Sequence, residues 1–79
     1  MEGLYILGHS YSNIAREYHE TLPNTAIDYY MKSIDFYLRG IGLDENMNRR
    51  HYILKNMFTI LIHTEELQRM IHLKNMFIK

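Results

Sequence analysis

Residues 22–46, LPNTAIDYYMKSIDFYLRGIGLDEN, contain the only proline of the chain and two of its four glycines. Leu22-Pro23-Asn24 predicts the end of one helix and the start of the next, with Asn24 as the N-cap. Gly40 and Gly42 predict the end of that second helix, because glycine readily adopts the left-handed conformation of a C-cap. Asp44 or Asn46 can then cap a third helix, which meets no further proline or glycine.

The spacing of apolar residues supports this division of the chain. Apolar side chains recur every three or four residues in each segment, which is typical of amphipathic helices. The stripes are Leu4, Leu7, Tyr11, Ile14, Ala15 and Tyr18, then Ile27, Tyr30, Ile34, Leu38 and Ile41. The sequence therefore predicts one all-α domain over residues 1–79, an antiparallel three-helix bundle with helices near 4–20, 24–41 and 46–75.

The third predicted helix is apolar around most of its circumference. Its apolar run comprises Ile53, Leu54, Met57, Phe58, Ile60, Leu61 and Ile62. A surface helix of a bundle needs one apolar face, and this helix has nearly two. We expect it either to be central and buried or to line a groove that another molecule fills. Its pentapeptide Leu54–Phe58 recurs as Leu73–Phe77, a repeat offset by nineteen residues that turns the second copy by about 100°.

The charge is balanced overall but divided along the chain. Residues 1–48 carry three basic and seven acidic side chains, net −4, and residues 49–79 carry six basic and two acidic ones, net +4. Either the two halves complement each other or the basic half attracts an acidic partner. A net charge of zero argues against nucleic-acid binding. No run is long and apolar enough for a transmembrane helix, so we expect a cytoplasmic protein.

Catalytic and metal-binding patterns are missing from the sequence. The five histidines form no i, i+4 pair, and the adjacent Glu65 and Glu66 point about 100° apart on a helix. No nucleophile elbow or glycine-rich phosphate loop occurs. We therefore predict a non-enzymatic protein without a cofactor. Seven tyrosines and six methionines instead favour an adaptable peptide-binding surface.

Two helical families resemble parts of this sequence. Leu7-Gly8-x-x-Tyr11 is similar to the first helix of a tetratricopeptide repeat, but Tyr11 lies fifteen residues before Ala26 where that repeat needs about nine. The more extensive resemblance is to the MIT domain, the microtubule-interacting and trafficking module. Residues 26–38, AIDYYMKSIDFYL, resemble its second-helix pattern A-[IL]-x-x-Y-x-x-[AS]-[IV]-x-x-x-[LF], and residues 60–67, ILIHTEEL, resemble the end of its third helix.

The MIT resemblance implies a function and a site. MIT domains bind short helical or extended motifs, often ESCRT-III C-terminal tails, between helices 2 and 3 or between helices 1 and 3. Ile62 stands where many members have an acidic anchor, and His63 stands where they have an arginine, which implies a more apolar contact or use of the other groove. The expected peptide-binding residues are Tyr29, Phe36, Met57, Ile60, Thr64 and Leu67, with core packing as their alternative role.

The resemblance leaves rivals in place. On the MIT interpretation the chain is a monomer that is recruited to endosomal membranes. A tetratricopeptide-like fragment of a larger regulatory protein would instead expose an apolar face and self-associate. A third alternative is peripheral membrane contact through the basic C-terminal helix with Phe77 and Ile78.

Overall fold

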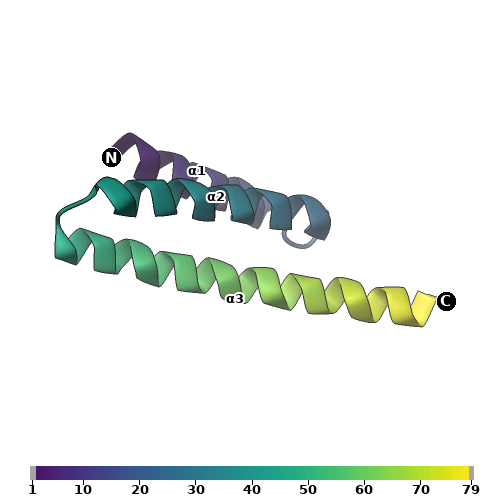
Figure 1. The fold of residues 1–79 in the computed structure, drawn as a ribbon. Coiled ribbons are helices and arrows are strands. Elements are labelled where there is room, and N and C mark those ends of the chain that lie inside the picture. Colours follow the sequence, from purple (N-terminus) through teal and green to yellow (C-terminus); the bar gives the residue numbers. More distant parts are fainter. Residues whose placement is uncertain (1, 79) are drawn as a thin grey trace.

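The computed structural model describes residues 2–78, which form three α-helices that run up, down and up (Figure 1). The helices are α1 (Glu2–Tyr18), α2 (Pro23–Leu43) and α3 (Met47–Ile78). The prediction of an all-α antiparallel three-helix bundle is confirmed. The molecule is elongated, 50 × 17 × 14 Å, because α3 has 32 residues and runs past the turn that joins α1 to α2.

Proline, not asparagine, begins α2. Leu22 occupies the N-cap position without a side-chain hydrogen bond, and Pro23 is the first helical residue. Proline suits this position, since its fixed φ is helical and its missing N–H would have no partner there. The backbone N–H of Ala26 then donates to the carbonyl of Leu22 at 2.9 Å. The prediction of Asn24 as the N-cap was therefore wrong by two residues.

Neither glycine near residue 41 ends α2. The helix continues through Gly40 and Gly42 to Leu43, and no glycine among residues 2–78 has a positive φ. Gly40 is buried because the ring of Tyr5 lies on it: a Cβ there would come within 2.5 Å of Tyr5 Cε1. The predicted left-handed C-cap at Gly42 was wrong, and Gly40 serves the close approach of α1 to α2.

The connection between α2 and α3 is stabilised by hydrogen bonds of Asp44 and Asn46. Asn46 caps α3, since its Oδ1 accepts a hydrogen bond from the backbone N–H of Arg49 at 3.0 Å. Asp44 is buried and binds side chains of α1 and α3. Tyr5 Oη of α1 donates to its Oδ2 at 2.8 Å, and Arg49 of α3 donates through Nε and Nη2 at 2.8 and 2.9 Å. The Arg49 guanidinium holds the pKa of this carboxyl well below its usual range. Burial, aided by Asp44, raises the pKa of Tyr5 to about 12.

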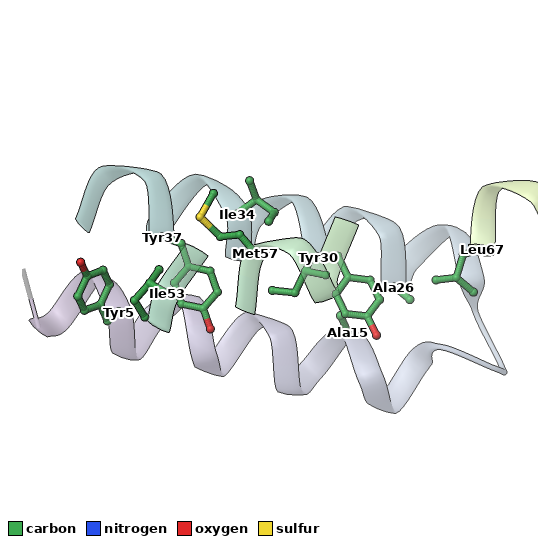
Figure 2. Packing of buried hydrophobic residues seen from close by; sticks show 10 residues of the cluster. Tyr5, Ala15, Ala26, Tyr30, Ile34, Tyr37, Ile53, Met57 and Leu67 are labelled. Carbon is green, nitrogen blue, oxygen red and sulfur yellow. The ribbon is translucent and has the colours of Figure 1, made fainter. Parts of the chain in front are cut away.

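The core lies along the line where α2 meets α1 and α3 (Figure 2). Tyrosines fill much of it: Tyr30 and Tyr37 of α2 are each 1% exposed. On α1 the buried positions are Tyr5, Gly8 and Ala15, whereas Leu7 of the predicted stripe is exposed. Ser33 ties the helices together, since its buried hydroxyl donates to the carbonyl of Gly8 at 2.6 Å. On α2, Leu38 of the predicted stripe is likewise exposed.

The two copies of the pentapeptide repeat have different environments on α3. In the first copy Met57 belongs to the core, whereas in the second copy Met76 is exposed. The last fully buried side chain of α3 is Leu67. The helix therefore extends about three turns past the end of its core contacts.

Candidate functional site

The third helix carries a second apolar strip outside the core. Leu54, Phe58, Leu61 and Ile62 are 40, 68, 45 and 55% exposed. They are spaced i, i+4, i+7 and i+8, which places them along one side of the helix. The core stripe of the same helix, Ile53, Met57 and Ile60, is turned away by about 120° on average. We call the four exposed residues the α3 strip.

The six predicted groove residues do not line one groove. Four of them lie on the inner face of α3 and are buried: Met57, Ile60, Thr64 and Leu67. Figure 2 shows Met57 and Leu67 within the packed core, and the hydroxyl of Thr64 donates to the carbonyl of Ile60 within its own helix at 2.9 Å. These four side chains have the core-packing role that the sequence left as their alternative.

Tyr29 and Phe36 lie on the side of α2 that faces α1. The ring of Tyr11 stacks on both of them, with centroids 6.0 Å from Tyr29 and 5.4 Å from Phe36. The ammonium of Lys32 lies 5.6 Å from the ring centroids of both Tyr11 and Tyr29. These half-buried rings join α1 to α2, and α3 contributes to none of these ring contacts.

A polar groove lies between α1 and α3. The MIT resemblance implied a groove between these helices, but of the residues that line it only Ile60 was predicted. Its volume is about 240 Å³ and its floor is formed by Tyr30 and Tyr37, whose hydroxyls point toward α1 in Figure 2. Most of the lining is polar: His9, Ser12, Asn13 and Arg16 from α1, and Tyr52, Asn56, Thr59, Ile60 and His63 from α3. The sequence does contain a sign of it, since both polar sets recur every three or four residues.

Hydrogen bonds and ring contacts fix the walls of this groove. Tyr37 Oη lies 2.6 Å from Nδ1 of His9, and Tyr30 stacks on His63 with ring centroids 6.0 Å apart. His19 contacts Tyr30 and His63: its Nδ1 lies 3.3 Å from Tyr30 Oη, and its ring is perpendicular to that of His63 with centroids 5.7 Å apart. Burial raises the pKa values of Tyr30 and Tyr37, so both hydroxyls stay protonated at neutral pH and can donate hydrogen bonds.

The charge of α3 differs from that of the other helices. It carries five basic and two acidic side chains, while α1 carries one basic and two acidic ones. Of the three ion pairs found among residues 2–78, only Arg49–Asp44 joins the acidic and basic halves of the sequence. Arg69–Glu65 and Arg39–Asp35 are exposed pairs within single helices. Helix α3 therefore carries a net excess of three basic side chains.

Residues 2–78 contain neither a metal-binding cluster nor a membrane-spanning helix. No group of three or more potential metal ligands is present, and no helix has the length and hydropathy needed to cross a bilayer. Comparison with protein-family models, curated proteins and solved structures gave no match.

Proposed function

We propose that this chain is a protein-interaction module whose α3 strip holds an acidic amphipathic helix of a partner. The observation that carries the proposal is that α3 uses one face for the core and leaves Leu54, Phe58, Leu61 and Ile62 exposed at helical spacing. A bound helix with leucines at i, i+3, i+4 and i+7 matches such a strip. Burying apolar surface of this kind is the main driving force of association.

The charge of α3 selects among such partners. Lys55 precedes Phe58 by three residues, so its ammonium lies beside the strip on the same side of the helix. With a net excess of three basic side chains on α3, a partner carrying Asp or Glu beside its leucines gains favourable Coulomb energy. The strip is shorter than a standard interface, so we expect affinities of about 1–100 μM and rapid exchange.

The resemblance of residues 26–38 and 60–67 to the MIT domain supports one partner class, the C-terminal tails of ESCRT-III subunits. Ile62, which replaces the acidic anchor of many MIT domains, is exposed and belongs to the α3 strip. An apolar contact at this position fits a docking surface built from leucine, isoleucine and phenylalanine. In this proposal the chain acts in the cytoplasm and reaches endosomal membranes through its partner.

The proposal is tested by titrating the ¹⁵N-labelled chain with peptides and following amide chemical shifts. The peptides are helical and extended ESCRT-III tails, together with a designed helix of leucine and glutamate and its lysine-substituted control. We expect the helical acidic peptides to shift amides of residues 54–62, and the lysine control to have no effect. Shifts at the α1–α3 groove with the extended peptide alone would show that the partner binds in that groove and not on the α3 strip. No response to any peptide would refute the proposal.

A second function, part of a larger helical-repeat protein, is favoured by the overhang of α3. Met70, Leu73, Lys74 and Phe77 line an apolar hollow of about 310 Å³ on this overhang, past the last core residue. A neighbouring repeat would cover such a surface. Sedimentation velocity separates the two functions. The interaction module is expected to be a monomer at 100 μM, whereas a repeat fragment is expected to self-associate, and Phe77→Glu should abolish that association.

A further inference from the structure

The lining of the polar groove between α1 and α3 contains an arginine and two histidines and no acidic side chain. Arg16, His9 and His63 lie around it, and the remaining side chains are hydroxyls, amides and one isoleucine. We infer that this groove binds a small oxyanion, a phosphate or carboxylate group. The site is separate from the α3 strip, so it does not depend on the proposed helix-binding function.

Arg16 supplies the charge that an oxyanion requires. Arg16 is exposed on α1. Its Nη2 donates a hydrogen bond to Oδ1 of Asn13, which orients the guanidinium. Asn13 and Arg16 are one helical turn apart and both line the groove. A guanidinium presents a planar fork of N–H donors that matches the two oxygens of a carboxylate or phosphate. The bond to Asn13 uses one nitrogen and leaves donors on the others.

The two histidines add ring N–H donors, and the tyrosine floor holds their rings in place. Tyr37 is buried and protonated, and when its hydroxyl donates to Nδ1 of His9 the imidazole proton resides on Nε2. The ring of His63 is held between Tyr30 and His19 by stacking and edge contacts. Ser12, Asn56 and Thr59 line the same walls with short polar side chains. An anion in the groove would therefore meet hydrogen-bond donors from both α1 and α3.

Size and surroundings limit what can bind. A volume of about 240 Å³ is below the few hundred Å³ of most sites for drug-sized molecules, so the groove suits one phosphate or carboxylate group. Glu17 and Glu20 line a separate hollow that begins where the groove reaches Arg16 and His63. Their carboxylates disfavour an anion at that end, which places it between His9 and Arg16.

The test is an NMR titration of the whole chain with inorganic phosphate and with acetate at pH 7, sodium chloride holding the ionic strength constant. We expect saturable shifts of residues 9–16 and 52–63 with a dissociation constant of about 1–10 mM, a common range for single small anions. A response to phosphate alone identifies a phosphate site, and a response to both identifies a general oxyanion site.

Variants of groove residues test whether the anion binds in the groove. Arg16→Gln should weaken binding at least ten-fold and Asn13→Ala several-fold, each with a dispersed spectrum that shows the fold to be intact. Arg69→Gln is the matched control, because Arg69 is an exposed arginine paired with Glu65 away from the groove, and it should leave the affinity unchanged. Shifts no larger than those caused by chloride, or equal losses in the Arg16 and Arg69 variants, would overturn the inference.

Discussion

Replacing Gly8 by alanine should destabilise the bundle, although alanine is the better helix former. Gly8 lies in α1 directly beneath the ring of Tyr37. An alanine Cβ at this position would be 2.4 Å from Cδ1 and Cε1 of that ring. Ordinary contact begins near 3.4 Å, so the ring or the whole helix must move by about 1 Å. The ring is 1% exposed and has little free space to enter.

The expected loss is set by three terms. Overpacking a core position costs about 1–3 kcal/mol. Displacing Tyr37 also weakens its 2.6 Å hydrogen bond to His9, worth about 0.5–1.5 kcal/mol. Against these, alanine gains about 1 kcal/mol of helix propensity over glycine. We therefore expect Gly8→Ala to lower the free energy of unfolding by about 0.5–3.5 kcal/mol.

Gly42 provides the matched control within the same bundle. It is also helical, but a Cβ there meets nothing within 4 Å. Gly42→Ala should therefore raise the free energy of unfolding by about 0.5–1 kcal/mol. Urea unfolding followed by far-ultraviolet circular dichroism measures both changes. A Gly8→Ala protein as stable as Gly42→Ala would refute the close approach of α1 and α2 in this structure.

Three further predictions concern the polar contacts that hold the helices together. The folded pKa of Asp44 is depressed, so its contribution to the free energy of unfolding is present above about pH 4 and is lost as pH falls. The urea midpoint should therefore drop between pH 5 and 2.5 more in the native chain than in Asp44→Asn. Tyr5 has a raised pKa of about 12, so its contribution to the free energy of unfolding is full below about pH 10 and declines as pH rises from there. Tyr5→Phe should therefore lose less stability at alkaline pH than the native chain. An unchanged dependence of the urea midpoint on pH would contradict the contact with Asp44. Ser33→Ala should cost about 1 kcal/mol in urea unfolding, since it leaves the α1 carbonyl without its 2.6 Å partner, whereas Ser10→Ala on the exposed surface should be neutral.

The helices could be predicted from the sequence because breakers are rare and apolar spacing is regular. The boundaries were less predictable, since two breakers act in ways that local rules do not distinguish. Pro23 fits inside the first turn of α2, and Gly40 lies within the helix because Tyr5 packs on it. The need for a glycine at position 40 arises from a residue thirty-five positions away, which no local pattern reveals.

The same limit applies to the candidate site. The sequence indicated that α3 has more apolar surface than a core needs, and the structure shows Phe58 and Ile62 exposed. It could not say which residues face inward, because Met57 and Phe58 are equally apolar and only packing against α2 separates them. The polar lining of the α1–α3 groove was not predicted, because polar residues on two helices form a site only when the bundle brings them together.

The α3 strip is tested most directly by measuring, with isothermal titration calorimetry, how Phe58→Asp changes the affinity for the designed acidic leucine helix. The control is Ile6→Asp, because Ile6 is an apolar residue of α1 with similar exposure, 62% against 68% for Phe58. We expect Phe58→Asp to raise the dissociation constant at least ten-fold, because it removes an apolar contact and places a carboxylate against an acidic partner. We expect less than a two-fold change for Ile6→Asp. Equal affinities for the two variants would contradict the claim that α3 carries the docking surface.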